Sequence, residues 1–300
     1  MEVFCTGGTG FIGSYVVNEL LSKGDKIRIL ARNPEKVKGF LNNPDISFIK
    51  GKLKDREAVR EGLSGCDACV HIALGWGDKG VSMLENDTLT SVFIFETALD
   101  MGIKKIVYTS STAAVGEIRK EMDTDSVCHP VDLYGAAKAS AEKYLEALSK
   151  YYPDTQCNII RPGYTFGNPV VEGADTQPDQ RFNDIVKNAL NDKDIQLIKH
   201  DGTQFICADD LAKIYSAVLE GELDNRIFFG LGNEFITWEE VAQRAIAAAN
   251  SESRVYLEDK GWDKDYGNFD VSGIQETFGF SFNPRKKIDE HISYFIRTLQ

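Results

Sequence analysis

The chain has 300 residues, of which 42% are hydrophobic and 27% charged, a composition typical of a globular protein that builds its core without disulfides or metals. Its 34 basic and 46 acidic side chains give a net charge of −12, which argues against nucleic acid or an anionic membrane as a partner. It opens on an apolar segment without a charged leader and has no apolar run of about 20 residues, so we expect a cytoplasmic protein.

Short apolar runs alternate with longer amphipathic runs over the first 160 residues. The short runs predict strands at 2–5, 26–31, 46–50, 68–72, 105–109 and 156–161. The longer runs predict helices at 11–23, 34–42, 55–63, 82–101 and 132–150. This alternation predicts βαβ units and therefore an α/β fold, a Rossmann-type doubly wound parallel sheet covered by helices on both faces.

The alternation changes after Pro162. Residues 163–183 are irregular and rich in Gly, Pro, Asn and Asp, which predicts a loop over a site. Further elements are expected at 209–220, 226–229, 237–249 and 284–299. We therefore predict a dinucleotide-binding domain over 1–162 and a smaller, mainly substrate-binding region over 163–300, of which about 209–231 returns to the sheet.

A glycine-rich stretch, TGGTGFIG at 6–13, joins the first strand to the first helix. It fits GxGxxG from Gly8 and GxxGxxG from Gly7. Such a loop lets the backbone approach a pyrophosphate, which then lies at the positive end of the helix. We predict dinucleotide binding here, with the contacts made by Gly7, Gly10, Phe11, Ile12 and Gly13.

The end of the second strand indicates which dinucleotide binds. An NAD site places Asp or Glu there, about 20 residues beyond the glycines, to accept from the ribose 2′-hydroxyl. This strand ends in Leu-Ala-Arg-Asn at 30–33, while Asp25 precedes it and Glu35 follows the turn. Arg32 could instead be a solvated surface residue, but its forked cation suits a 2′-phosphate, so the sequence favours NADP(H).

Tyr134 and Lys138 stand four residues apart near the start of the helix predicted at 132–150. This spacing places both on one helical face, where an ammonium can lower the pKa of a phenol for acid–base chemistry. The strand at 105–109 ends in Thr109-Ser110-Ser111-Thr112, and hydroxyls at the carboxyl end of a parallel strand reach the ligand crevice. Ser111, Tyr134 and Lys138 are therefore the predicted catalytic residues.

With these motifs the chain resembles the extended short-chain dehydrogenase/reductase superfamily, also called the NAD-dependent epimerase/dehydratase family. The similarity runs nearly from end to end. The matching stretches are TGGTGFIG at 6–13, DACVHIA at 67–73, YTSSTAAVG at 108–116, YGAAKASAE at 134–142, RPGYTFGNP at 161–169, ADDLA at 208–212 and GLGN at 230–233.

The resemblance implies roles for individual residues. Ser111, with Ser110 as the alternative, would fix the substrate oxygen, Tyr134 would be the acid/base, and Lys138 would be its electrostatic partner and contact the nicotinamide ribose. The regions of Ala73 and Pro162 would form walls of the cofactor site. The resemblance also implies a homodimer through the helices at 82–101 and 132–150, the alternative for the apolar first of these being burial under the substrate region.

Three positions depart from the family pattern. The family has Gly-Asp-Leu after the third strand, and its aspartate contacts adenine. This chain has Gly-Lys-Leu at 51–53, so Lys52 alters the adenine contact. Leu53, which follows, is expected to contact the cofactor. The asparagine of the fourth crossover helix is Asp87. Thr203 stands where sugar-nucleotide enzymes place an arginine for the diphosphate.

These features favour an NADP(H)-dependent oxidoreductase that interconverts a carbonyl and an alcohol. A nucleotide-sugar epimerase or dehydratase with a tightly held cofactor is the main alternative, and a non-catalytic NADP(H) sensor is a third. Trp76, Tyr164 and Phe166, together with Ser111, are expected to contact a small substrate, and Arg181 is the best candidate for holding an anion. The scattered histidines and a lone CxxC at 66–69 predict no metal site.

Overall fold

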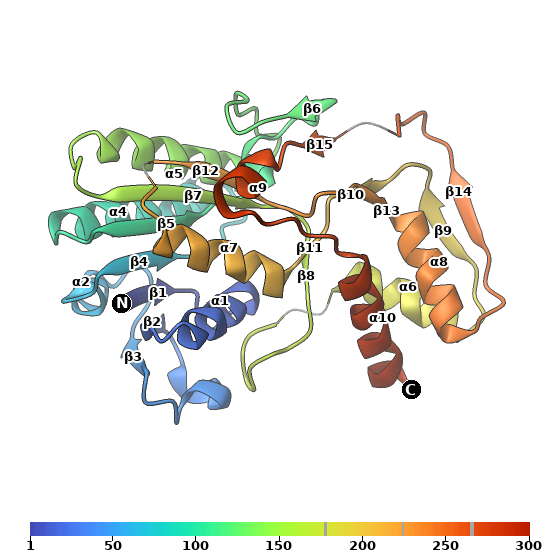
Figure 1. Cartoon of the computed structure of the whole chain (residues 1–300), viewed down its shortest axis with the longest axis horizontal. Helices are drawn as coiled ribbons and strands as arrows, with labels where there is room; N and C mark the ends of the chain where they lie inside the picture. The colour runs from blue at the N-terminus through green and yellow to red at the C-terminus, as the bar shows by residue number, and fades with distance from the viewer. Residues whose placement is uncertain (177–178, 224, 265–266) are drawn as a thin grey trace.

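A parallel sheet of seven strands forms the larger part of the molecule (Figure 1). This computed structural model describes residues 1–176, 179–223, 225–264 and 267–300. The strand order is β12-β7-β5-β4-β1-β2-β3, with every neighbouring pair parallel. The strands are β1 (Glu2–Thr6), β2 (Lys26–Ala31), β3 (Ile46–Lys50), β4 (Ala68–His71), β5 (Lys105–Thr109), β7 (Gln156–Pro162) and β12 (Ile227–Gly230). The predicted doubly wound α/β fold is thus confirmed.

Helices cover both faces of the sheet because successive strand side chains point to opposite sides. Val3 and Cys5 of β1 pack in one core with α1 (Phe11–Ser22) and α7 (Ala208–Glu220). Phe4 packs in the other core, which is built by α2 (Arg56–Leu63), α4 (Leu89–Asp100) and α5 (Leu133–Ser149). The segment 208–230 adds α7 and β12 to this sheet, far along the chain from the other strands.

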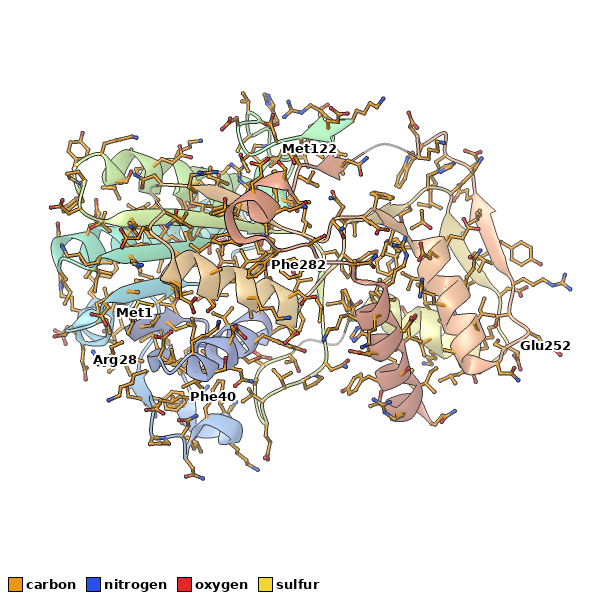
Figure 2. All side chains as sticks on the ribbon, in the orientation of Figure 1. Met1, Arg28, Phe40, Met122, Glu252 and Phe282 are labelled. Carbon is orange, nitrogen blue, oxygen red and sulfur yellow. The ribbon has the colours of Figure 1, made fainter. Side chains whose placement is uncertain are left out.

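The smaller part of the molecule lies beyond the carboxyl ends of the strands, at the right in Figure 1. Its helices α6 (Gln180–Leu190), α8 (Trp238–Ala249) and α10 (Arg285–Leu299) pack on one another around a core rich in aromatic rings. A parallel pair, β9 (Ile195–Ile198) and β14 (Val255–Glu258), borders them. Figure 2 places Phe282, in the segment before α10, between the two parts of the molecule.

Shorter elements complete the described chain. These are α3 (Gly80–Met83), α9 (Ser272–Phe278) and three strand pairs: β6 (Glu121–Met122) with β15 (Asn268–Phe269), β8 (Thr165–Phe166) with β11 (Ile206–Cys207), and β10 (Gly202–Thr203) with β13 (Ile236–Thr237). Within the described ranges no helix is both long and apolar enough to cross a bilayer. The cytoplasmic location and the dimer through α4 and α5 stay predictions.

The helix predicted at 34–42 was wrong. Two 3₁₀ turns, Pro34–Lys36 and Lys38–Phe40, occupy that segment. The Gly39 amide donates to the carbonyl of Glu172, and a Cβ on Gly39 would lie 2.8 Å from the Val171 side chain. The segment therefore bends to receive the loop around residue 172, a long-range contact that local periodicity does not reveal.

Two other predicted segments differ in detail from the structure. The helix predicted at 82–101 contains a π-helical turn, Leu84–Thr88, between α3 and α4. The segment 163–183, predicted as a loop, includes β8 and the first turn of α6. Residues 177–178 of that segment lie outside the described chain.

Candidate active site

A cavity of about 1030 Å³ lies along the carboxyl ends of the sheet strands. It spans the point between β1 and β4 where the strand order reverses, the usual ligand position in such sheets. The structure brings together there the residues predicted for the cofactor and for catalysis. Its lining includes Gly7, Gly10, Phe11, Ile12, Gly13, Arg32, Leu53, Ala73, Trp76, Ser111, Tyr134, Lys138 and Pro162.

The glycine loop forms one wall of this cavity. Gly7 has a φ of +76°, and a Cβ there would lie 2.6 Å from the Ala73 amide nitrogen. A Cβ on Gly13 would lie 2.0 Å from the Gly7 carbonyl oxygen, so this turn requires glycine at both positions. No side chain of the described chain caps α1, whose first-turn N–H groups have no partner within the helix. This cradle of backbone donors fits a dinucleotide pyrophosphate.

The cavity is basic where it meets the ends of β2 and β3. Arg32, at the end of β2, and Lys52 and Lys54, just beyond β3, line it together. Among the described residues no aspartate or glutamate lines the cavity at the ends of these two strands. An acidic acceptor for a ribose 2′-hydroxyl is therefore absent from the described lining at this end.

The predicted catalytic residues meet because the start of α5 lies against the turn that follows β5. Asp132 caps α5 by accepting from the Gly135 amide at 2.6 Å. A Cβ on Gly135 would lie 2.2 Å from the Ala113 carbonyl oxygen, so glycine permits this close approach. Ser111 caps the turn at 112–114 and, with Tyr134 in the first turn of α5, faces the cavity.

Burial and neighbouring groups set the ionisation of this site. Burial raises the pKa of Tyr134, the Asp87 carboxylate raises it further, and a hydrogen bond from the Ser111 hydroxyl lowers it. Lys138 is 2% exposed, and burial lowers its pKa while Asp87, 3.6 Å away, opposes that shift. The Lys138 ammonium lies 5.9 Å from the centre of the Tyr134 ring. The ammonium is thus close enough to stabilise a phenolate electrostatically.

His71 is a structural residue rather than a base. Its Nδ1 lies 2.6 Å from the Thr6 hydroxyl and its Nε2 lies 2.9 Å from the Ser91 hydroxyl. Burial lowers the pKa of His71 to about 3, so the ring is neutral at physiological pH. Its ring stacks on that of Tyr108 in the neighbouring strand β5, with 5.6 Å between the ring centres.

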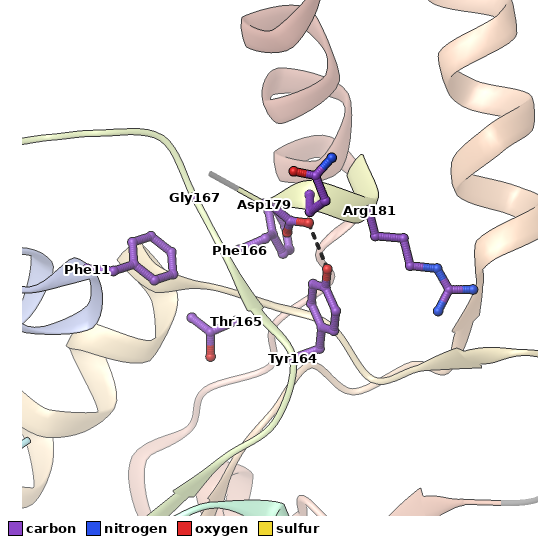
Figure 3. Close-up of a pocket in the computed structure, with 8 residues that line it drawn as sticks. Phe11, Tyr164, Thr165, Phe166, Gly167, Asp179 and Arg181 are labelled. Carbon is purple, nitrogen blue, oxygen red and sulfur yellow. Dashed lines mark hydrogen bonds between the residues drawn. The ribbon is translucent and has the colours of Figure 1, made fainter. Parts of the chain in front are cut away.

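A second cavity, of about 450 Å³, holds most of the residues predicted for the substrate (Figure 3). Tyr164, Phe166 and Arg181 line it, as do Phe11 and Thr165, which also line the larger cavity. Trp76 instead lies at the larger cavity, 61% exposed.

Tyr164 and Arg181, two polar side chains that line this second cavity, already have partners within the protein. The Tyr164 hydroxyl donates to Asp179 at 2.8 Å, the bond drawn in Figure 3. The Arg181 guanidinium pairs with Asp201 at 2.5 Å and lies 4.1 Å from the centre of the Trp238 ring. Arg181 therefore has an anionic partner within the protein.

Sequence reasoning missed several residues that line the larger cavity, among them Thr9, Asn86 and Asp175. Asp175 reaches it because its amide donates to the Thr9 carbonyl at 2.9 Å, which carries the segment after β8 across the glycine loop. Nothing in the local pattern around 175 signals this contact. Among the described residues no cluster of His, Cys, Asp or Glu could hold a metal ion, and Cys66 and Cys69 are free buried thiols.

The sequence model of the NAD dependent epimerase/dehydratase family matches residues 3–228 of this chain. An uncharacterized protein of Sinorhizobium fredii, y4nG, is 30% identical over 83% of this chain and 61% of its own length. The 4-hydroxy-2-methyl-3-oxo-4-farnesyl-3,4-dihydroquinoline-1-oxide ketoreductase of Stigmatella aurantiaca is 28% identical over 56% of this chain and 51% of its own. The chain thus spans between half and two thirds of these two relatives.

Among solved structures, the UDP-glucuronic acid 4-epimerase of Bacillus cereus in complex with NAD superposes on the whole chain. The TM-score is 0.84, both chains are fully covered, and the sequences are 18% identical. At that identity the likeness concerns the fold.

Proposed function

The chain belongs to the NAD-dependent epimerase/dehydratase family, and on that premise we propose that it transfers hydride between a nicotinamide cofactor and a carbinol or carbonyl carbon of a small molecule. The observation that carries this proposal is the convergence of Ser111, Tyr134 and Lys138 on the cavity that the glycine loop borders. A bound nicotinamide supplies or accepts the hydride. The net reaction that we favour is oxidation of an alcohol or reduction of a ketone or aldehyde.

The three side chains divide the remaining work. Ser111 donates a hydrogen bond to the substrate oxygen and holds it beside Tyr134. Tyr134 gives its phenolic proton to that oxygen in reduction and removes it in oxidation. Burial raises the pKa of Tyr134. The charge of Lys138 opposes that rise, because it stabilises the phenolate.

Purified protein tests this proposal directly. Stoichiometric loss of NADPH with a panel of ketones and aldehydes would support a net oxidoreductase. Cofactor that copurifies and is never consumed, while a sugar nucleotide is converted, would support an epimerase or dehydratase instead.

The cofactor of our proposal is NADP(H). Arg32, Lys52 and Lys54 support it, because three cations at the end of the cavity suit a 2′-phosphate and the described lining there offers no carboxylate to a free 2′-hydroxyl. The neighbouring epimerase was solved with NAD, which makes NAD(H) the alternative.

Arg32→Ala is expected to weaken NADPH binding by about 10- to 100-fold, since a lost charge-assisted contact costs about 1.5–3 kcal/mol. NADH binding should stay within about two-fold of wild type by the same argument. Calorimetric titration of both cofactors measures this. Lys26→Ala, which removes an exposed cation from the other end of β2, is the matched control. Equal NADPH affinity in wild type and Arg32→Ala would refute the assignment.

A nucleotide-sugar epimerase or dehydratase is the second candidate, and overall similarity favours it. A solved structure that covers the whole chain is a UDP-glucuronic acid 4-epimerase, whereas the ketoreductase matches about half of the chain. The local chemistry favours the net oxidoreductase. Thr203 has no charge to offer a diphosphate, and Arg181 is already paired with Asp201. A diphosphate that lacks fixed cations is costly to bury.

Calorimetry with UDP and dTDP decides between the two candidates. In the presence of saturating cofactor we expect no binding in the micromolar range to wild type. Micromolar binding of either nucleotide that Arg181→Ala abolishes would overturn our preference. Arg254→Ala, which removes an exposed arginine of the same part of the molecule, controls for the change in net charge.

A further inference from the structure

Asp87 is a buried carboxylate beneath the catalytic end of the larger cavity. It lies in the π-helical turn Leu84–Thr88 that precedes α4, and its side chain is 1% exposed. One oxygen accepts from the Gly75 amide at 2.9 Å, and Gly75 itself lines the cavity. The other oxygen lies 3.6 Å from the Lys138 ammonium and has no hydrogen-bond donor among the described residues. The Gly75 amide therefore holds one oxygen of this carboxylate, and the Lys138 ammonium is the cation beside the other.

The other ionisable groups around this pair leave its charge balance unchanged. Glu142, one turn along α5 from Lys138, is bound to Arg161 through two contacts of 2.9 and 2.7 Å. His71 is neutral because burial lowers its pKa to about 3. Tyr108 of β5, whose ring lies 5.1 Å from the Lys138 ammonium, and Tyr134 are phenols whose pKa values burial raises, so both are neutral in the free protein. Lys138 and Asp87 thus form a pair with no net charge.

This neutrality matters to a nicotinamide because only one of its redox forms carries a ring charge. The oxidised ring is a cation and the reduced ring is neutral. An ammonium without a counterion in a desolvated site would repel the oxidised ring and leave the reduced ring almost unaffected. A carboxylate beside the ammonium cancels that repulsion.

We propose that Asp87 is a positioning residue that neutralises Lys138 and so raises the affinity of the site for the oxidised cofactor relative to the reduced one. The proposal rests on the function proposed above, since it requires that a nicotinamide binds over Lys138. Asp87 acts through Lys138 and touches neither the hydride nor the substrate. Its consequence is a more reducing cofactor when bound.

The test measures two dissociation constants by calorimetry, one for the oxidised and one for the reduced cofactor, and takes their ratio. The cofactor used is NADP(H) or NAD(H), whichever wild type binds more tightly. Asp87→Asn keeps the shape and the acceptor for the Gly75 amide but removes the charge. We expect the ratio of the oxidised to the reduced constant to rise at least about ten-fold, because a unit charge within about 12 Å contributes at least that much at an effective dielectric constant near 20. A structural role would weaken both forms equally.

Three further variants complete the experiment. Glu85→Gln removes an exposed carboxylate from the same π-helical turn and should leave the ratio unchanged. Asp87→Ser removes the charge while making room for a water beside Lys138, and it replaces Asp87→Asn if that variant does not fold. Asp87→Asn combined with Lys138→Met restores a neutral pair, so its ratio should return to the wild-type value although both affinities fall.

The outcomes separate this inference from the proposed function. Wild type that binds neither redox form of either cofactor contradicts the proposed function. Wild type that binds both forms, with an unchanged ratio in the folded Asp87 variants, overturns the role of Asp87 alone. A ratio that rises as much in Glu85→Gln would also overturn it, because the effect would then belong to net charge.

Discussion

Replacing Tyr134 with phenylalanine is expected to lower turnover at least ~100-fold, the usual scale for the loss of a general acid or base. The substitution removes one oxygen and leaves the ring near Lys138 and at the wall of the cavity. The affinity for the cofactor should therefore change little. Rates of NADPH oxidation with a carbonyl substrate and calorimetric binding of NADPH measure the two effects separately.

Tyr144→Phe is the matched control for this prediction. Tyr144 lies on the same helix, α5, and is 54% exposed, so removing its hydroxyl should alter neither turnover nor binding. Near-normal turnover in Tyr134→Phe would show that another group moves the proton. A loss of cofactor affinity as large as the loss of turnover would instead indicate a damaged site.

The parts of the site that could be predicted are those in which one short segment carries the chemical requirement. The turn at 6–13 needs glycine at positions 7 and 13 because any Cβ there would contact backbone atoms. The spacing of these glycines in the sequence therefore predicts the turn. Tyr134 and Lys138 lie on one face of a helix, and their spacing of four residues is enough to predict this. The central strands β1, β4 and β5 are almost fully buried, and the apolar run that each one forms is also a local property.

The parts that could not be predicted depend on contacts between distant segments. The loop around residue 172 turns the segment 34–42 away from a helix, and its continuation brings Asp175 to the glycine loop. Asp201 follows Arg181 by 20 residues, so the partner that engages this arginine is invisible to periodicity. The π-helical turn that carries Asp87 was likewise hidden within an ordinary helical pattern.

A buried ion pair links β7, in the core of the fold, to α5, the helix that carries Tyr134 and Lys138. Arg161 is 1% exposed and Glu142 is fully buried, and two hydrogen bonds join the guanidinium to the carboxylate. Arg161 directly precedes Pro162, which lines the cavity, and Glu142 follows Lys138 by one turn. The pair therefore holds this wall of the cavity at a fixed distance from the helix that carries Tyr134 and Lys138.

Glu142→Gln is expected to destabilise the protein by about 3–5 kcal/mol, because it leaves the Arg161 charge buried without a counterion. The free energy of unfolding, from urea titration, measures this loss. Glu146→Gln makes the same chemical change one turn along α5, in a half-exposed pair with Lys143, and should cost at most about 1 kcal/mol.

Removing both charges separates the two contributions of this pair. The double variant Arg161→Met with Glu142→Leu should recover much of the lost stability, since apolar groups of similar size replace a buried pair at little net cost. Its turnover should nevertheless stay below that of wild type, because packing alone does not fix the bidentate geometry that positions α5. A double variant as unstable as Glu142→Gln would mean that the space, rather than the unpaired charge, determines stability here.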